Sequence, residues 1–345
     1  MMIFGTVASS KHTAGGSPVT PTLFASSGSA GVVAYSFTFA GGFGSRYSDP
    51  GSAAAGGAGL TYAASSNTLG IAHNSPYVGT YPWSGSGFGT RYANPGTLPT
   101  GSGHGCAFTP SGNDIAVAHD SSPYVSTYPF SAGFGSKYTN PGTLPGGNGN
   151  DVAFTSTAIA LATASAPYTD AYAWTGGSGF GSKAGNPGTA LAGLAFSVAF
   201  APAGNALAFG HNATPFASAY VWSGSSYGGK YSNPSGLSGL NLCYGISYAP
   251  NGNSIAIAAY NTSPYVHGYG WSTGSGFGSK AGNPSVLPGN LATGTAFSPN
   301  SDVVFVSHSN SPYVSAYPWT GAFGTKFADA ASPLASTASD VMMIQ

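Results

Sequence analysis

The sequence predicts an all-β fold built from seven copies of one unit. A stretch reading SPYVSAYPWTGAFGTKFAD from Ser311 recurs as SPYVGTYPWSGSGFGTRYANP from Ser75 and as SPYVSTYPFSAGFGSKYTNP from Ser122. The copies lie 44 to 49 residues apart, anchored at Ala30, Pro76, Pro123, Pro167, Pro215, Pro264 and Pro312. Each holds four short strand-like segments separated by Gly, Pro, Asn and Ser. Repeats of this length with four strands are typical of propeller blades. We therefore expect a seven-bladed β-propeller with four-stranded antiparallel blades.

The unit from Gly105 to Pro141 shows how each strand is predicted. The turn-forming sequence TPSGN separates the first two strands, and the third, YVSTYPF, alternates large and small residues. The Asn-Pro step ends the unit because Pro cannot donate to a strand ladder. The four predicted strands are 106–108, 115–119, 124–130 and 133–138. The first strand should lie nearest the axis and the fourth at the rim.

The two ends of the chain complete the count of strands. Residues 20–26 read as a second strand, so the first blade lacks its inner strand at the N-terminal end. The sequence DVMMI at 340–344 resembles the inner strand DVAF at 151–154. We expect residues 336–345 to complete blade 1 and close the ring, which removes open sheet edges. Residues 3–8 are the alternative inner strand. The predicted domains are an N-terminal arm or extra strand at 1–19 and one propeller at 20–345.

Charge is scarce in this chain. Charged residues make up 5% of the sequence, the net charge is zero, and Glu is absent. A neutral chain lacks the basic field that binds nucleic acid, and no apolar run is long enough to insert in a membrane. The N-terminus has no basic segment before its short apolar run, so we expect no signal peptide. With so few titrating groups, we expect stability to depend little on pH.

Seven of the eight basic residues share one repeat position, three residues before an Asp or Asn. They form a predicted ring of Arg46, Arg91, Lys137, Lys183, Lys230, Lys280 and Lys326. The ring could bind an anionic glycan or the carboxylates of a partner protein. Alternatively, each cation lies over a neighbouring aromatic ring and pairs with the Asp or Asn, which is a structural role. The second interpretation is favoured, and both stay open.

Histidine and tryptophan also repeat with the fold. His73, His119, His211 and His308 end the predicted second strands, where other units carry Ser26, Thr163 and Tyr260. We interpret these histidines as buried residues that fix blade packing. Trp83, Trp174, Trp222, Trp271 and Trp319 end the third strands, with Phe37 and Phe130 in the other two units. Because Ser and His recur with the repeat and no pair of carboxylates stands out, we predict no enzyme activity, no metal site and no cofactor.

The Phe-x-Pro turn after the first strand and the Trp closing the third resemble WD-repeat propellers. The Asp after Trp and the Gly-His pair of that family are missing. Phrases of the type VAFSPSGNDIAVAH, SPYV and GFGSKYANP, which this chain carries for example as CAFTPSGNDIAVAH at 106–119 and GFGSKYTNP at 133–141, look more like propeller repeats of bacteriophage virion and tail proteins. This resemblance implies a non-enzymatic virion structural protein, a capsid decoration or tail-associated component that binds other virion proteins. It would be made in the host cytoplasm and act in the extracellular particle.

Two alternatives to the virion role stay open. One is a lectin-like propeller that binds host-surface glycans near the basic ring. The other is a protein-interaction scaffold of WD-repeat type.

Overall fold

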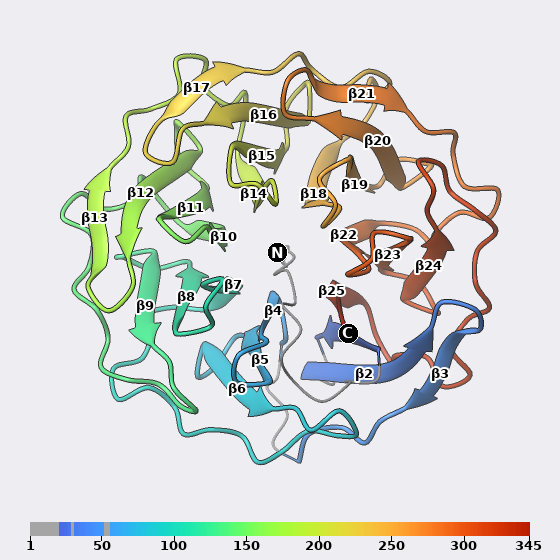
Figure 1. The fold of residues 1–345 in the computed structure, drawn as a ribbon, viewed down its shortest axis with the longest axis horizontal. Coiled ribbons are helices and arrows are strands. Elements are labelled where there is room, and N and C mark those ends of the chain that lie inside the picture. Colours follow the sequence, from blue (N-terminus) through green and yellow to red (C-terminus); the bar gives the residue numbers. More distant parts are fainter. Residues whose placement is uncertain (1–20, 29–30, 52–55) are drawn as a thin grey trace.

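The structure, a computed structural model, describes residues 21–28, 31–51 and 56–345. These residues form 25 strands in seven antiparallel sheets, with no helix among them. The sheets surround a central axis like the blades of a fan, and the chain follows the ring in order (Figure 1). Because the described residues contain no helix, none of them offers a helical membrane span. The prediction of a seven-bladed β-propeller is confirmed.

Four blades contain four strands, ordered from the axis to the rim. Blade 1 comprises β25 (Ala338–Ile344), β1 (Thr22–Ser27), β2 (Gly31–Thr38) and β3 (Gly42–Arg46). Blade 4 comprises β10 (Gly149–Phe154), β11 (Ala158–Thr163), β12 (Thr169–Thr175) and β13 (Gly179–Lys183). Blade 5 comprises β14 (Ala195–Phe200), β15 (Ala206–His211), β16 (Ala217–Trp222) and β17 (Tyr227–Lys230). Blade 6 comprises β18 (Leu242–Tyr248), β19 (Ser254–Tyr260), β20 (Val266–Ser272) and β21 (Gly276–Lys280).

The other three blades contain three strands, and a single bridge holds the fourth segment. Blade 2 comprises β4 (Leu60–Ala63), β5 (Thr68–Ala72) and β6 (Val78–Pro82). Blade 3 comprises β7 (Gly103–Phe108), β8 (Asp114–His119) and β9 (Val125–Pro129). Blade 7 comprises β22 (Ala292–Phe297), β23 (Val303–His308) and β24 (Val314–Pro318). The bridges join Trp83 to Phe88, Phe130 to Phe134 and Trp319 to Phe323. Each lies where the outermost strand of the fuller blades begins.

The C-terminal strand closes the ring. β25 pairs with β1 in antiparallel register, with Val341 opposite Ala25. The strand, Ala338–Ile344, lies within the predicted closing segment 336–345. The prediction that the C-terminus supplies the inner strand of blade 1 is therefore confirmed. The predicted arm at 1–19 and the alternative strand at 3–8 lie outside the described residues.

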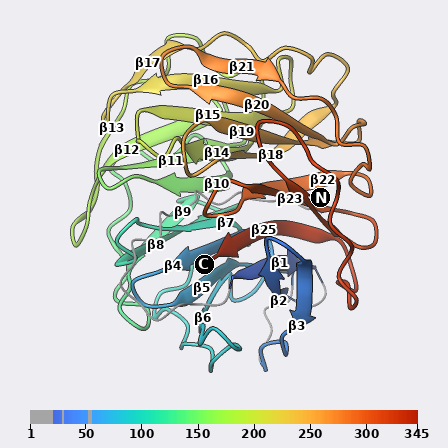
Figure 2. The ribbon, with the colours of Figure 1, turned by 45° about the vertical axis from the view of Figure 1, so that its right-hand side comes forward.

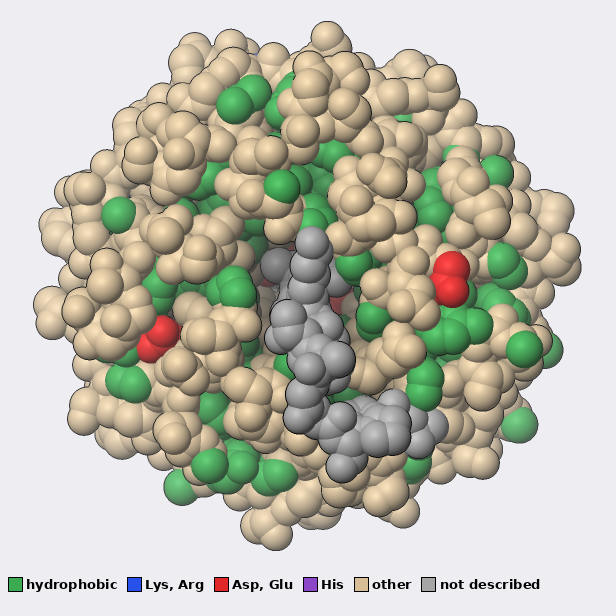
Figure 3. All heavy atoms as spheres, in the orientation of Figure 1, with side chains coloured by type: hydrophobic (Ala, Val, Ile, Leu, Met, Phe, Trp, Pro, Cys, Tyr) green, Lys and Arg blue, Asp and Glu red, His purple; other side chains and the backbone are tan. Residues whose placement is uncertain are grey.

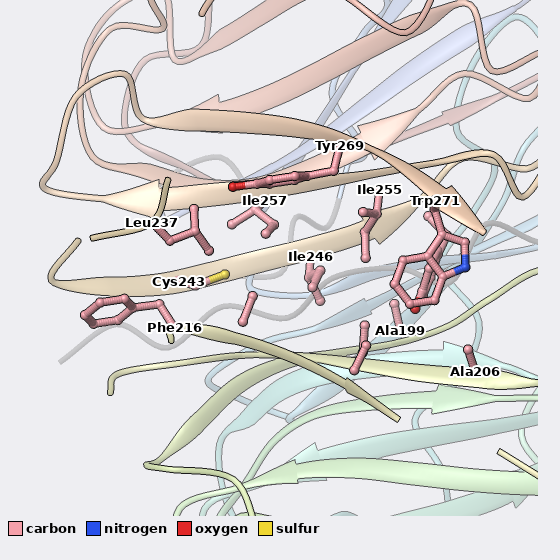
Figure 4. Close-up of a cluster of buried hydrophobic side chains, with 14 of the residues drawn as sticks. Ala199, Ala206, Phe216, Leu237, Cys243, Ile246, Ile255, Ile257, Tyr269 and Trp271 are labelled. Carbon is pink, nitrogen blue, oxygen red and sulfur yellow. The ribbon is translucent and has the colours of Figure 1, made fainter. Parts of the chain in front are cut away.

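The hydrophobic core lies between neighbouring blades. Between blades 5 and 6, Ile246, Ile255 and Ile257 pack with Trp271 against alanines of blade 5 (Figure 4). The small side chain of Ala206 faces the large ring of Trp271 in the same cluster, which lets the two sheets approach closely. Stacked sheets of this kind bury both faces of each inner strand. In the oblique view of Figure 2, the sheets lie one above another with the inner strands at the centre.

Six inner strands carry a β-bulge near their start, at the second residue of the strand in five of them and at the third residue in β18. In β7, Gly103 lies opposite His119 and Gly105 opposite Ala118, which leaves His104 as the inserted residue. In β7 the residue after the bulge is glycine because the inner strands nearly touch there: a Cβ on Gly105 would lie 2.8 Å from the Cα of Asp151. Bulges often redirect a side chain next to a functional site.

Candidate functional site

The six bulge residues form a ring around the axis, called the bulge ring below. Its members differ from blade to blade: His104, Asn150, Phe196, Tyr244, Thr293 and Ser339. They lie at the end of each blade where the second strand finishes and the third begins. The backbone position recurs from blade to blade, but the residue type at that position changes. Such a position is a good candidate for function, since repeated packing alone would favour similar residues.

Two polar members of the bulge ring bridge to the next blade. The Asn150 side-chain N–H donates to the carbonyl of Ala195 at 2.6 Å, and the Thr293 hydroxyl donates to the carbonyl of Ala338 at 2.7 Å. Between these two, in blades 5 and 6, Phe196 and Tyr244 are in contact, with ring centroids 4.6 Å apart. Tyr244 also meets Tyr260 edge-on at 4.6 Å. The ring therefore has an aromatic side in blades 5 and 6 and polar members in the other blades.

His104 is the titratable imidazole of the bulge ring, and its Nε2 atom, like Asn150 Oδ1, is buried without a hydrogen-bond partner. The side chain is half-buried, and burial lowers its pKa below the ordinary histidine value. The Asp120 carboxylate, which directly follows β8, partly opposes this shift in pKa. The Ser121 hydroxyl donates to Asp120 Oδ1 at 3.0 Å. A neutral imidazole beside a carboxylate is an arrangement that can accept a proton from water.

The His104–Asp120 pair breaks the repeat at two positions. The strand register aligns Asp120 with Gly28, Asn74, Ala164, Asn212, Tyr260 and Ser309 in the other blades. Asp120 is therefore the one acidic residue at its position, as His104 is the one histidine of the bulge ring. The sequence interpretation missed both because it searched for recurring residues. The signal that could have revealed them is their departure from the repeat.

Two buried carboxylates join inner strands next to the bulge ring. Asp340 Oδ2 accepts from the backbone N–H of Leu60 at 2.9 Å, and Asp151 Oδ2 accepts from that of Val198 at 2.9 Å. Each also accepts from the amide that follows it. Burial raises the pKa of Asp340 well above its ordinary value. Since backbone amides donate to these oxygens, both carboxylates hold the inner strands of neighbouring blades together. No group of three or more possible metal ligands occurs among the described residues.

Three of the four repeated histidines make the same hydrogen bond. In each, Nε2 lies 3.0 Å from a serine hydroxyl of the third strand, in the pairs His119–Ser126, His211–Ser218 and His308–Ser315. All three rings are fully buried. The register also corrects two predicted equivalents: Ser27 and Ala259 occupy this position, whereas Ser26 and Tyr260 each lie one residue away. The β19 strand is one residue longer than β8, which displaced the sequence alignment.

The fourth histidine has a different neighbour. In blade 2 the serine is replaced by Gly79, and both ring nitrogens of His73 lack partners. A Cβ on Gly79 would lie 3.0 Å from Arg91 Nε and 3.3 Å from His73 Nε2. The guanidinium therefore fills the space that a serine side chain takes elsewhere. Arg91 also donates to the carbonyl of Val78 at 3.1 Å.

The basic ring lies on the outer segments, and its members contact groups of their own blades. Arg46 and Lys326 pair with Asp49 and Asp329, and Lys183 pairs with Asp170 at 2.5 Å. Lys137, Lys230 and Lys280 donate to Asn140, Asn233 and Asn283 at 2.6 to 2.9 Å. Among the residues drawn in colour, the face in Figure 3 displays no Lys or Arg. This geometry matches the structural interpretation of the ring, and a binding role for it stays a prediction.

The repeated tryptophans lie in the core between blades. Trp83, Trp174, Trp222, Trp271 and Trp319 are each at most 5% exposed. Trp83, for example, meets Phe24 of the neighbouring blade edge-on at 4.9 Å. Such edge-to-face contacts add to the area that the rings bury.

Comparison with known proteins shows a shared fold without a close sequence relative. No family model matches the chain, and no curated protein matches it. A candidate 6-phosphogluconolactonase from Bacteroides fragilis superposes with a TM-score of 0.72 at 11% identity, over 95% of this chain and 98% of that one. The periplasmic gluconolactonase of Pseudomonas aeruginosa superposes with a TM-score of 0.70 at 14% identity, over 94% and 99%. A chain of the mitotic checkpoint complex gives 0.59 at 13%, over 82% and 79%. At these identities the likeness shows the fold.

These comparisons contradict the predicted function. Two of these propellers carry lactonase names, in contrast to the predicted non-enzymatic role. The prediction of a non-enzymatic virion structural protein, with its lectin and scaffold alternatives, is therefore wrong. Its physical error was to treat every His and Ser as part of the repeat, which hid the His104–Asp120 pair. The WD-repeat resemblance holds at the level of the propeller fold, and nothing supports its bacteriophage part. The predicted virion location and partners stay predictions.

Proposed function

We propose that this propeller is a hydrolase of small cyclic esters, with sugar lactones as the substrate class. The observation that carries the proposal is the His104 imidazole, whose buried Nε2 has no partner and which the register of β7 and β8 brings to the end of the strand that Asp120 follows. Both residues lie at one end of the propeller axis, and both differ from the residues at the matching positions of the other blades. The lactonase names of proteins with the same architecture support the choice of ester.

The chemistry requires one base and one water molecule. His104 Nε2 takes a proton from water while the water oxygen bonds to the lactone carbonyl carbon. The resulting tetrahedral carbon then breaks its bond to the ring oxygen. The imidazolium returns its proton to that oxygen, which leaves an open-chain hydroxy acid. One water is consumed, and the histidine ends as it began, so no further reactant is needed.

The environment of His104 suits this role. Since burial lowers its pKa, the imidazole is neutral at pH 7 and can accept a proton. Once protonated, it is stabilised by the negative charge of Asp120. A carboxylate beside a histidine base thus assists the charged intermediate, as in other hydrolases.

The test is hydrolysis of glucono-δ-lactone by the purified full chain, followed by pH-stat titration and corrected for the spontaneous rate. We expect wild type to hydrolyse the lactone and His104→Gln to lose about 10²-fold or more in kcat, the usual contribution of a general base. Ser309→Ala, at the position of blade 7 that matches Asp120, is the control and should keep full activity. Equal rates for wild type and His104→Gln would refute the assignment.

A further inference from the structure

The charges around the bulge ring are all of one sign among the described residues. His104 and Asp120 directly follow Gly103 and His119, which lie opposite each other in the register of β7 and β8, and Asp151 and Asp340 lie in the inner strands. The basic side chains belong to the outer segments, where each has a partner in its own blade. No Lys or Arg of the described residues therefore faces the bulge ring, and the half-buried Asp120 is its most accessible carboxyl group.

We propose that the site takes an uncharged sugar lactone and that Asp120 is the residue that excludes a phosphorylated one. This inference rests on the function proposed above. A phosphate monoester carries a charge of about −1.5 to −2 at pH 7, and phosphate sites normally supply Arg, Lys or a helix N-terminus. The described residues have no helix and place no cation here. Like charges brought together at a binding site weaken binding severely.

The remaining members of the site suit a neutral ring. Tyr260 is half-buried, and it packs edge-on against Tyr244. An aromatic ring of this kind can contact the C–H face of a sugar, a contact that requires no charge on the ligand.

The experiment compares kcat/KM for glucono-δ-lactone and its 6-phosphorylated form in four proteins. Wild type should prefer the neutral lactone by about 10-fold or more. Asp120→Asn should lower the overall rate but raise the ratio of phosphorylated to neutral turnover by about 10-fold, a change that a purely structural role would not produce. Asn212→Lys places a cation at the position of blade 5 that matches Asp120, and it should raise the same ratio.

Ser223→Lys is the matched control for the added charge. Asn212 precedes β16 and Ser223 follows it, so the two lysines lie at opposite ends of one strand. Both positions are exposed, and circular dichroism should show native folding. Ser223→Lys should leave the ratio unchanged.

Two results would count against the inference in different ways. The inference would be overturned if wild type hydrolysed both lactones and preferred the phosphorylated form. It would also be overturned if neither Asp120→Asn nor Asn212→Lys changed the ratio of kcat/KM for the phosphorylated lactone to that for the neutral one. Either result would leave the proposed function standing. Hydrolysis of neither lactone by wild type would overturn the proposed function and the inference with it.

Discussion

Asp340 and Leu60 are 280 residues apart in sequence, yet the Asp340 carboxylate accepts a hydrogen bond from the Leu60 backbone N–H at 2.9 Å. This contact joins the C-terminal strand β25 to the inner strand of blade 2. Asp151 makes the same contact with Val198 between blades 4 and 5, also at 2.9 Å. The C-terminal strand is therefore held to blade 2 by the same type of contact, a carboxylate accepting from a backbone N–H, that joins blades 4 and 5.

Removal of the Asp340 carboxylate tests this closure. Asp340→Ala leaves two buried amide donors unpaired, those of Leu60 and Val341, at a cost of about 1–3 kcal/mol each. We expect the free energy of unfolding in urea to fall by about 2–5 kcal/mol. Asp49→Ala, which removes an exposed ion pair with Arg46, should cost less than about 1 kcal/mol. Similar losses in the two variants would mean that Asp340 does not hold the ring closed.

The histidine–serine pairs make a second prediction. Ser126→Ala removes the hydroxyl that lies 3.0 Å from His119 Nε2 and leaves a buried nitrogen unpaired. We expect a loss of about 1–3 kcal/mol in the free energy of unfolding, measured by urea denaturation. Ser131→Ala, an exposed change in the same blade, is the control and should be neutral. A Ser126→Ala protein as stable as the control would show that the pair is not a stabilising contact.

Acid should destabilise the protein, which corrects the expectation that stability depends little on pH. Burial lowers the pKa of five histidines from 6.5 to about 4: His73, His119, His211, His267 and His308. Between pH 6.5 and 4 the unfolded chain binds protons that the folded chain does not. Stability is therefore complete above pH 6.5 and falls as pH drops towards 4, by roughly 1 kcal/mol per pH unit for each histidine. The raised pKa of Asp340 has the opposite effect on stability, because there the folded chain binds the proton more tightly than the unfolded chain. It is one group against five histidines.

The measurement is the urea midpoint at pH 7, 6, 5 and 4.5 for wild type and His119→Gln. We expect a smaller decrease with acid in the variant, because one titrating group is gone. A midpoint that stays constant over this range would contradict the assignment of neutral buried histidines.

The fold could be predicted because propeller blades repeat with a nearly constant period. The SPYV phrase, the tryptophans and the spacing of the Asn-Pro steps each report packing that every blade needs. The DVMMI segment at the C-terminus could be matched to DVAF because Asp340 and Asp151 make equivalent contacts. Local pattern and global architecture agree here, which is the usual condition for a predictable fold.

The candidate site could not be predicted in the same way. His104 is the extra residue of a β-bulge in β7. Because most inner strands carry the same bulge, the extra residue does not change the repeat period and cannot be recognised from it. The proximity of His104 and Asp120 depends on pairing between β7 and β8, which brings the start of one strand to the end of the next. The extra residue in β19 likewise misaligned Tyr260, and only the pairing of Ile255 with Tyr269 corrects it.

The central claim is that neutral His104 acts as the base in lactone hydrolysis. The most direct measurement is the dependence of kcat/KM on pH for wild type and Asp120→Asn with glucono-δ-lactone. Because burial lowers the pKa of His104 and Asp120 raises it, wild type should lose activity only below pH 6.5, and the variant should lose it at lower pH still. A profile without an acid limb, or a limb that Asp120→Asn leaves in place, would contradict the account.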